Sequence, residues 1–182
     1  MEEAKAIALC QKGDLTAFST LYDEYIKPIY NFVFYKTHHK ETAEDLVSIV
    51  FTKSLEKIQT FNSDKASFKT WLYQIARNTI TDHFRSNKET ADIDDVWGLS
   101  TKDDIVTDLD VKMKMEEVKK YLKKLKSSQR EVVMLRVWGG HSFQEIAEIT
   151  GKTEASCKMM FKRTIENLRG DLAVLALLIY FI

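Results

Sequence analysis

Residues 68–78 read Phe-Lys-Thr-Trp-Leu-Tyr-Gln-Ile-Ala-Arg-Asn, and their spacing decides the fold of the N-terminal half. Apolar or small side chains recur at helical intervals and form one stripe that holds Phe68, Trp71, Leu72, Ile75 and Thr79. That period is typical of an amphipathic helix that turns its stripe toward a core. We therefore predict a helix that begins near Ser67 and continues past Asn78.

The opposite face of this helix carries aromatic and basic side chains: Tyr73, Arg77, Thr81, Phe84 and Arg85. An exposed ring forfeits burial worth about 2 kcal/mol, so a ring on an outer face needs a reason. Rings and guanidinium groups together can stack on unpaired bases and neutralise phosphates. The alternative is that Tyr73 and Phe84 pack on another helix of the same domain, and the sequence leaves both interpretations open.

Two earlier stretches show the same helical period. The first begins near Asp14, whose side chain can cap a helix, and Pro28 is expected to bend this helix without ending it. Its apolar stripe holds Phe18, Leu21, Tyr22, Tyr25, Ile29, Phe32 and Val33. The second begins at Thr42, and its stripe holds Ala43, Leu46, Val47, Val50, Phe51, Ser54 and Ile58. The three patterns predict a helical domain over residues 1–87.

The net charge of the chain is zero, with 27 basic and 27 acidic residues among 182, which by itself argues against a nucleic-acid binder. The charge is unevenly distributed, however. Residues 1–85 carry 11 basic and 11 acidic side chains, residues 86–113 carry three and eight, and residues 114–170 carry 13 and seven. The third segment is therefore suited to DNA, and the middle one, which lacks helical periodicity, is predicted to be an acidic linker over residues 88–113.

A helix-turn-helix domain is predicted over residues 114–170. The segments Ser128-Gln-Arg-Glu131 and Ser142-Phe-Gln-Glu145 both match the capping box that opens a helix, and a third helix opens at Thr153. Glycines follow the first and the second of these helices. A short helix, a tight turn with glycine and a longer helix form the layout of this DNA-binding motif.

The last of these helices is predicted to read DNA. Projected at 100° per residue, its outward face holds Ala155, Ser156, Met159, Lys162, Arg163 and Glu166, with Lys158 on the flank. Lys and Arg can pair with phosphates or guanine edges, Ser can pair with either, and Met can press on a thymine methyl group. The alternative is the ordinary solvated face of a three-helix bundle. We favour DNA contacts by Ser156, Lys158, Met159, Lys162 and Arg163.

Two parts of the chain resemble bacterial sigma factors. Residues 43–51, Ala-Glu-Asp-Leu-Val-Ser-Ile-Val-Phe, and residues 68–78 resemble region 2, and residues 142–149 with 158–163 resemble region 4. Two domains joined only by a linker form the plan of the extracytoplasmic-function (ECF) group of the sigma-70 family. The resemblance implies an all-α chain that binds core RNA polymerase, directs it to promoter DNA and helps to melt that DNA. It implies no catalytic residue, cofactor or metal of the chain's own.

The resemblance also implies roles for single residues. Asp45, Ser48 and Phe51 match the helix that docks on the clamp coiled coil of the polymerase, although a glutamine is usual where Ser48 stands and an acidic or polar residue where Ile49 stands. Lys158 and Arg163 match basic positions of the minus-thirty-five reader, whereas Met160 stands where a basic residue is common.

For the minus-ten element, the match falls on one loop and one helix. The loop of residues 61–67 matches the loop that captures a flipped promoter base, with Phe61, Asn62, Ser63, Lys65 and Ser67 as its contact residues. The helix that opens and reads the element is matched by Trp71, Tyr73, Arg77 and Asn78. Of these, Trp71 and Asn78 are expected to be partly structural because they lie nearer the core stripe.

Two other functions were weighed against this one. A free-standing helix-turn-helix regulator would explain residues 114–170 but would leave the helix of residues 68–78 without a role. An enzyme is disfavoured because the histidines lack a metal-binding spacing and the chain has neither a nucleophile motif nor a Gly-rich phosphate loop. Those histidines are His38, His39, His83 and His141.

The remaining features concern compartment and partners. The acidic N-terminus lacks an apolar signal core, and Cys10 and Cys157 form no disulfide framework, so a cytoplasmic protein is expected. Residues 172–182 carry no charge, but as a helix they would span roughly 17 Å, short of the ~30 Å hydrocarbon core. This apolar tail (171–182) could pack on the C-terminal domain, dock an inhibitor or contact a membrane. The resemblance also implies an anti-sigma inhibitor as a partner.

Overall fold

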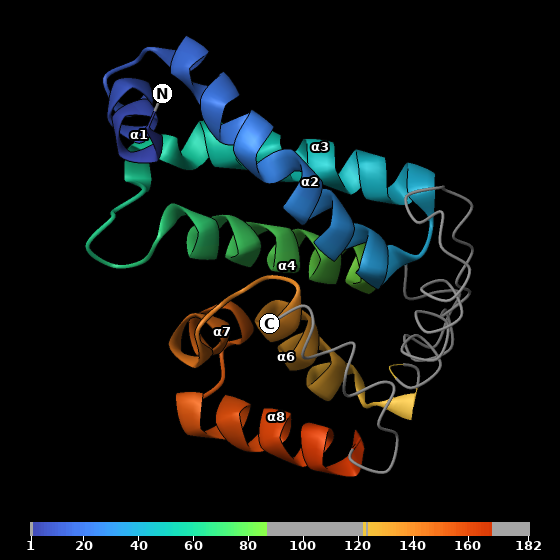
Figure 1. The fold of residues 1–182 in the computed structure, drawn as a ribbon. Coiled ribbons are helices and arrows are strands. Elements are labelled where there is room, and N and C mark those ends of the chain that lie inside the picture. The colour runs from blue at the N-terminus through green and yellow to red at the C-terminus, as the bar shows by residue number, and fades with distance from the viewer. Residues whose placement is uncertain (1, 87–121, 123, 169–182) are drawn as a thin grey trace, which may run out of the picture. The chain divides into compact units, whose positions relative to one another are not determined.

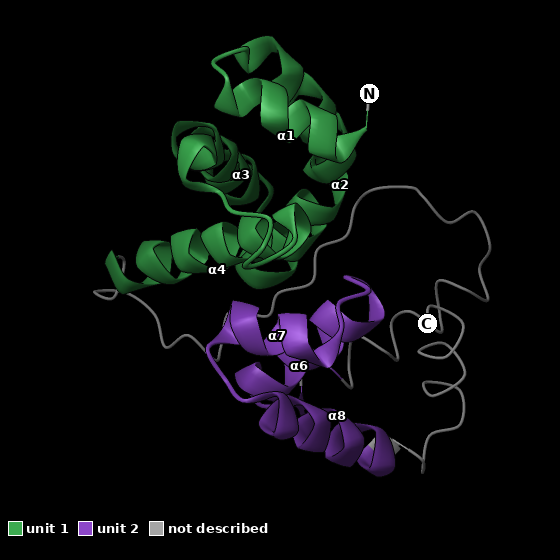
Figure 2. Cartoon of the chain, turned by 90° about the vertical axis from the view of Figure 1, so that its left-hand side faces the viewer, with its two compact units in different colours: residues 1–96 green, residues 97–182 purple. Residues whose placement is uncertain are grey.

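The structure, a computed structural model, describes residues 2–86, 122 and 124–168 (Figure 1). The chain divides into two compact units, residues 1–96 and residues 97–182 (Figure 2). The described parts of both units are helical, which confirms the predicted all-α class. The predicted linker (88–113) and the apolar tail lie outside the described residues, so the domain boundaries stay predictions.

The N-terminal unit consists of four α-helices and two single 3-10 turns among its described residues. They are α1 (Glu3–Gln11), η1 (Leu15–Ala17), α2 (Phe18–Thr37), α3 (Lys40–Lys57), η2 (Ile58–Thr60) and α4 (Phe68–Ser86). Helices α2, α3 and α4 pack on one another, and α1 packs on α2 and η2 (Figure 1). The sequence pattern predicted three of these helices and missed α1.

The helix ends of this unit follow local hydrogen bonds. Asp14 Oδ1 accepts from the backbone N–H of Thr16 at 3.1 Å, so Asp14 caps η1, and α2 follows directly with Pro28 in its interior. Helix α3 begins two residues before the predicted Thr42, because His39 caps it. Helix α4 begins beside Ser67 as predicted, and the Oγ of Ser67 accepts from the N–H of Thr70 at 3.2 Å.

The predicted stripes form most of the core. Every member of the α3 stripe is buried, as are all members of the α2 stripe except Tyr22, which is 42% exposed. On α4 the stripe is buried apart from half-buried Trp71. Helix α4 also buries Thr70, Tyr73, Ala76 and Ile80. Because α2 and α3 both pack on α4, this helix is buried over more of its circumference than a single stripe.

The C-terminal unit contains three described helices in the predicted order: α6 (Ser127–Val137), α7 (Phe143–Thr150) and α8 (Glu154–Leu168). Helix α8 packs on both α6 and α7. Among the described helices of the two units, none is long and apolar enough to cross a membrane.

One of the two predicted capping boxes is confirmed. Ser142 Oγ accepts from the N–H of Glu145 at 3.2 Å, and the Glu145 carboxylate accepts from the N–H of Ser142 at 2.7 Å. The predicted box at residues 128–131 is wrong. The N-cap of α6 is Lys126, two residues before Ser128; the Gln129 side chain accepts from the N–H of Lys126, and Glu131 is buried in the helix.

Candidate polymerase and promoter surfaces

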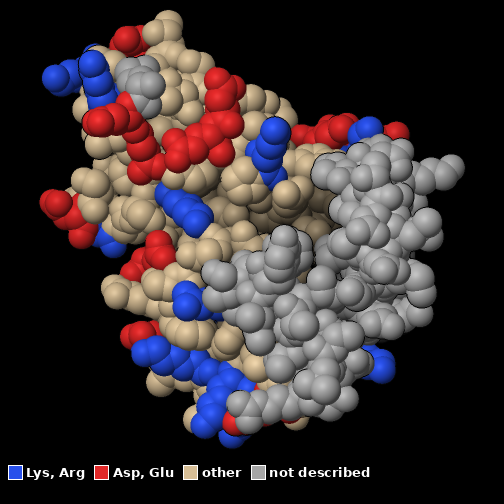
Figure 3. Space-filling model, viewed as in Figure 1, with Lys and Arg blue, Asp and Glu red and all other residues tan. Residues whose placement is uncertain are grey.

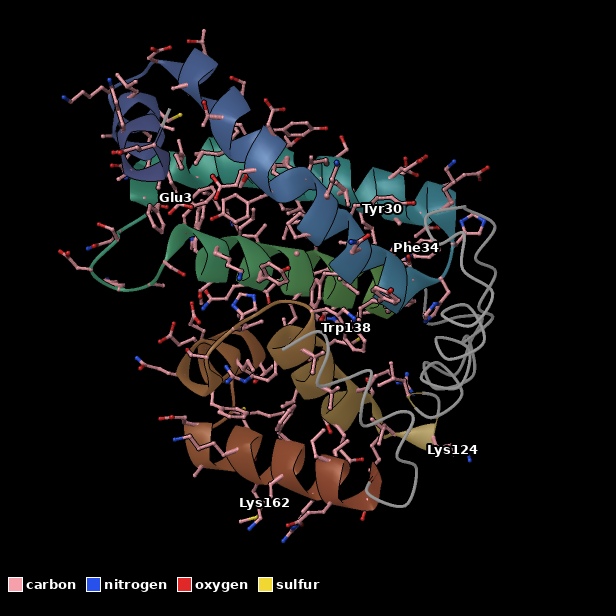
Figure 4. The ribbon with its side chains drawn as sticks, viewed as in Figure 1. Glu3, Tyr30, Phe34, Lys124, Trp138 and Lys162 are labelled. Atoms are coloured by element: carbon pink, nitrogen blue, oxygen red, sulfur yellow. The ribbon has the colours of Figure 1, made fainter. Side chains whose placement is uncertain are left out.

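The predicted reading helix α8 presents a continuous exposed face. All of its outward positions are exposed: Ala155, Ser156, Lys158, Met159, Lys162, Arg163 and Glu166. The opposite side is fixed by Cys157 and Thr164, both fully buried. Lys162 extends away from α6 and α7 (Figure 4). The structure therefore brings all five predicted DNA-contact residues of this helix onto one accessible surface.

Two lysines of this face form ion pairs along the helix. Lys158 Nζ lies 2.6 Å from Glu154 Oε1, and Lys162 Nζ lies 3.9 Å from Glu166 Oε1. Both pairs join residues four apart and are largely exposed, so each contributes little to stability. In Figure 3, Lys and Arg side chains gather at the lower edge of the molecule, where Figure 1 places α8. An approaching phosphate can therefore compete for these lysines.

The turn between α7 and α8 has the geometry that the motif needs. Gly151 ends α7 with φ at 68°, a left-handed conformation that glycine adopts without strain. Thr153 Oγ1 then accepts from the N–H of Ser156 at 3.2 Å and caps α8. The rings of Phe143 and Phe161 lie 5.5 Å apart and join α7 to α8. Helix α8 is thus held in a fixed orientation on α7.

A close approach also fixes the turn between α6 and α7. A Cβ atom added to Gly139 would lie 2.7 Å from both the His141 ring and the carbonyl oxygen of Leu135, so no larger residue fits there. The Arg136 guanidinium donates to the carbonyl of His141 at 2.9 Å and lies 5.0 Å above the Phe143 ring. These contacts orient the first helix of the motif.

In the N-terminal unit, the loop between η2 and α4 (residues 61–67) is compact and polar at its surface. Asn62 Oδ1 accepts from the N–H of Asp64 at 2.8 Å, and the backbone carbonyl of Asn62 accepts from the N–H of Lys65 at 3.1 Å. The predicted contact residues Asn62, Ser63, Lys65 and Ser67 are exposed. The loop therefore presents amide, hydroxyl and ammonium groups on a defined turn.

Buried rings lie beneath this loop. The Phe61 ring is 5.6 Å from that of Phe68 and 5.2 Å from that of Trp71, and the Phe68 and Trp71 rings are 5.5 Å apart. Tyr25 of α2 adds a fourth ring, 5.5 Å from Phe68. Phe61 is only 6% exposed, so it anchors the start of the loop instead of lying on its surface. This aromatic cluster (Tyr25, Phe61, Phe68, Trp71) holds the two ends of the loop together.

The outer face predicted for α4 is partly wrong. Tyr73 is 2% exposed and its ring lies 5.1 Å from that of Phe32 in α2, which is the alternative that the sequence left open. Burial raises the pKa of its phenol to about 12. The prediction failed because α2 packs on the side of α4 that a single stripe would leave to solvent. Phe84 is half-buried, with its ring 5.4 Å from that of His83.

The remaining predicted residues of α4 differ in exposure. Trp71 is half-buried, as expected for a partly structural role, and Arg77 is also half-buried. Asn78 was expected to be partly structural but is exposed. Arg77 and Asn78 come one turn or more after Trp71 on the same helix, so α4 continues the surface that the loop begins.

The predicted polymerase-docking residues lie on α3. Asp45 and Ser48 are exposed, and Ile49 is 42% exposed. Phe51 is buried instead, with its ring 4.8 Å from that of Tyr22 in α2. Ser48 and Phe51 thus face α2, so the predicted docking residues of α3 lie beside side chains of α2.

A groove of about 390 Å³ runs between α2 and α3 at this place. It is lined by Phe18, Tyr22, Ile26, Tyr30, Glu44, Val47, Ser48, Phe51, Thr52 and Leu55. The α2 side of the groove was missed, because periodicity assigned Tyr22 to the core stripe. Figure 4 labels Tyr30, whose ring stacks at 5.8 Å on that of Phe34. An apolar groove with polar residues at its edge suits a partner's side chains.

A metal site is not indicated among the residues that the structure describes. Within these residues, no group of three or more His, Cys, Asp or Glu side chains could hold a metal ion.

Comparison with known proteins identifies both units. A family model for Sigma-70 region 2 matches residues 21–90, and a model for Sigma-70 region 4 matches residues 115–168. The chain is 34% identical over 166 residues to the ECF RNA polymerase sigma factor BldN of Streptomyces coelicolor, an alignment that covers 87% of this chain and 61% of BldN. It is 36% identical over 135 residues to the RNA polymerase sigma factor YlaC of Bacillus subtilis, covering 72% and 78% of the two chains.

A solved structure has the same fold. The sigma factor RpoE, in its co-crystal structure with the anti-sigma factor NepR from Bartonella quintana, superposes with a TM-score of 0.67 at 22% identity, covering 84% of this chain and 94% of RpoE. The chain spans less than two thirds of BldN but more than three quarters of YlaC. Since region 2 and region 4 both match, the chain belongs to the ECF sigma factors of the sigma-70 family, non-catalytic subunits that direct RNA polymerase to promoters for transcription initiation.

Proposed function

We propose that the two units divide the work of promoter recognition. The C-terminal unit anchors duplex DNA of the minus-thirty-five element on α8, and the N-terminal unit captures a base of the melted minus-ten element and docks on polymerase. The observation that carries this proposal is the compact polar loop of residues 61–67 over its aromatic cluster. A free-standing regulator would have no use for such a loop.

The anchoring function follows from the chemistry of α8. The major groove of B-DNA is wide enough to admit an α-helix such as α8. Lys158, Lys162 and Arg163 supply phosphate or guanine contacts, and Ser156 and Met159 supply a hydroxyl and an apolar contact. Phosphate contacts set the register, whereas base contacts select the sequence.

The capture function follows from the energetics of melting. Removing a base from the stack costs a few kcal/mol, which a shaped pocket can offset. Asn62, Ser63, Lys65 and Ser67 offer hydrogen bonds at the edge of such a pocket, and half-buried Trp71 offers a ring at its base. Because the loop is already ordered, little entropy is lost when a base enters.

The docking function is assigned to α3 and the α2–α3 groove. Asp45 and Ser48 at its edge give polar contacts, and Tyr22 with Phe51 gives the apolar surface. We infer that the clamp coiled coil of core polymerase inserts a side chain there. The charge reversal Asp45→Lys should weaken co-purification with core polymerase, whereas Lys5→Ala, at an exposed position of α1, should not.

Runoff transcription with core polymerase on a genomic library tests the proposal and yields the promoter. Wild-type chain should give defined start sites. Arg163→Ala should reduce formation of the closed complex on duplex promoter. The double variant Asn62→Ala with Ser63→Ala should leave that complex intact and reduce melting. Melting is measured by the permanganate reactivity of unpaired thymines. If the loop variants melted the promoter as wild type does, the capture function would be wrong.

We also infer an anti-sigma partner and a cytoplasmic location. RpoE, which has the same fold, forms a complex with the anti-sigma factor NepR. Core polymerase and chromosomal DNA lie in the cytoplasm of bacteria, so a subunit of that polymerase works there. A candidate anti-sigma factor, co-expressed with the chain, should compete with core polymerase for binding to the chain. Cell fractionation should recover the chain in the same fraction as the polymerase.

A further inference from the structure

Helix α1 is joined to the base-capturing loop by two glutamines that bond across the chain. Gln11 Nε2 donates to the carbonyl of Ile58 at 3.1 Å and to the carbonyl of Phe61 at 2.8 Å. In the reverse direction, Gln59 Nε2 donates to the carbonyl of Cys10 at 3.1 Å. Each side chain thus bonds the backbone of the other's element.

The carbonyls involved lie at helix ends, and two of the three also accept a backbone bond, Cys10 from the N–H of Gly13 at 3.0 Å and Ile58 from the N–H of Phe61 at 3.2 Å. Cys10 lies in the last turn of α1, and Ile58 and Phe61 bracket the single turn of η2. A carbonyl oxygen has two lone pairs, so a side-chain amide can add a bond there and join a helix end to another element. Since Phe61 is also the first residue of the loop, the Gln11 amide fixes the backbone at the point where the loop begins.

Helix α1 is itself firmly held. Ala6 and Cys10 are fully buried, and the Tyr25 hydroxyl of α2 donates to the Glu3 carboxylate near the helix start. Figure 4 labels Glu3 on α1. The family model of region 2 begins at residue 21, so the match gives α1 no part. A rigid helix outside the matched region therefore bonds the one loop that carries the proposed capture function.

We propose that α1 is a brace for base capture and that Gln11, supported by Gln59, is a positioning residue for the loop of residues 61–67. This inference rests on the capture function proposed above. Gln11 touches no DNA. It keeps the Phe61 carbonyl and the Phe61 ring in place, so that the polar side chains of the loop meet a flipped base without prior ordering.

A purely structural role for α1 makes a different prediction. If the two glutamines only stabilised the N-terminal unit, their loss would lower its melting temperature and would weaken all DNA contacts alike. A positioning role instead predicts a loss confined to the captured base. The two roles are therefore separated by the base dependence of affinity, not by affinity itself.

The experiment measures binding of single-stranded non-template oligonucleotides to the holoenzyme by fluorescence anisotropy. The oligonucleotides carry the minus-ten element found by runoff transcription, with an abasic nucleotide at each position in turn. The variants are Gln11→Met and Gln59→Met, which remove the amide at nearly constant volume. Gln144→Met is the matched control, since Gln144 lies on α7 and bonds Glu148.

For wild type, removal of the captured base should weaken binding about 5-fold to 150-fold, the range for one stacked base. In Gln11→Met, removal of the same base should weaken binding about 3-fold or less, because the loosened loop no longer makes favourable contacts with that base. Gln59→Met should fall between the two, and Gln144→Met should match wild type. Abasic substitution elsewhere should affect all four proteins equally.

A spectroscopic readout accompanies binding. Fluorotryptophan labelling gives separate signals for Trp71, which packs on Phe61, and for the other two tryptophans, Trp97 and Trp138. Gln11→Met should broaden or shift the Trp71 signal and leave that of Trp138 unchanged. If Gln11→Met does not fold, Gln59→Met decides, since exposed Gln59 can be replaced without disturbing the core.

The brace is refuted if the glutamine variants lose as much affinity as wild type when the captured base is removed. If wild type itself shows no dependence on any base, the loop captures none. The capture function then fails, and the brace fails with it.

Discussion

On α8 of the C-terminal unit every side chain predicted to contact DNA is exposed, whereas in the N-terminal unit the predicted site includes three buried rings, those of Phe51, Phe61 and Tyr73. Duplex DNA offers a ready-made groove, so a helix surface is sufficient to read it. A base that has been flipped out of the duplex is bound in a shaped pocket of the protein, which a loop over packed rings can supply. The two units therefore differ in how closely contact residues are tied to the core.

This difference predicts two kinds of variant. Changes on α8 should alter DNA binding at constant stability. Changes beneath the loop of residues 61–67 should alter stability and promoter melting together.

The largest effect is expected for Phe68→Ala. Phe68 is 1% exposed and contacts three rings of the aromatic cluster, so its truncation should cost about 3–5 kcal/mol of the unfolding free energy. Met159→Ala on α8, where the side chain is 49% exposed, should cost less than about 0.5 kcal/mol. Urea unfolding followed by circular dichroism compares them. If the two substitutions lowered the unfolding free energy equally, the aromatic cluster would not be part of a packed core, and the proposed difference between the two units would be wrong.

Alkaline pH should weaken the N-terminal unit first. Burial raises the pKa of Tyr73 to about 12, whereas an unfolded tyrosine ionises near pH 10. Below about pH 10 both states keep the proton, so this group adds no pH dependence. Between about pH 10 and pH 12 the unfolded state loses it first, and stability should fall by about 3 kcal/mol.

The measurement is the urea midpoint between pH 8 and pH 12, with Tyr73→Phe as the comparison. The urea midpoint of the variant should decline less steeply with pH than that of wild type. Part of the decline should remain, because the pKa of Tyr25 is also raised by burial and by Glu3. Residues 124–168 contain no tyrosine, so the helix-turn-helix should lack this decline. The same slope in wild type and variant would contradict the assignment.

Arg163→Ala should reduce affinity for duplex promoter by about 5-fold to 150-fold, the range for one good base or phosphate contact. If the lost contact is to a phosphate, the slope of log affinity against log salt should decrease by about 0.9. The urea midpoint should stay unchanged because Arg163 is exposed. Lys5→Ala serves as a charge-matched control on α1. A variant that binds like wild type at every salt concentration would remove Arg163 from the reading face.

How far the sequence could predict this molecule depends on how many sides of a helix are packed. Among the described residues, α8 packs on α6 and α7 through the face of Cys157 and Thr164, so one stripe predicts its core and its outer face. Helix α4 packs on both α2 and α3, so Tyr73 is buried although it lies off the stripe. Periodicity carries no information about a second packed face. Likewise, Tyr22 fits the α2 stripe but lies at the edge of the α2–α3 groove, which only the placement of α3 reveals.

Short-range signals had the same limit. The capping box of Ser142 and Glu145 was correct, whereas the equally short box at residues 128–131 was wrong, because Gln129 accepts from the N–H of Lys126 and the helix starts earlier. Helix α1 was missed because its nine residues are too few to establish a stripe, and what holds it is distant in sequence. The bonds of Gln11 reach 47 and 50 positions along the chain, beyond any local pattern. The functional roles came from resemblance to sigma factors, since composition and spacing alone left α8 as either a reading helix or a solvated face.

The smallest expected effect concerns the ion pairs of α8. Glu154 holds Lys158 at 2.6 Å, and both side chains are about half exposed, so the pair is worth about 0.3–0.5 kcal/mol. DNA must break this pair to use the lysine. Glu154→Gln should therefore raise duplex affinity by about 2-fold at low salt, with the gain fading as salt rises. Glu166→Gln, whose pair is longer at 3.9 Å, should give less. Anisotropy titrations across a salt series measure both. If Glu154→Gln weakened binding instead, Glu154 would itself contact DNA, as a carboxylate does when it accepts from the cytosine amine, and α8 would read bases with an acidic side chain as well as basic ones.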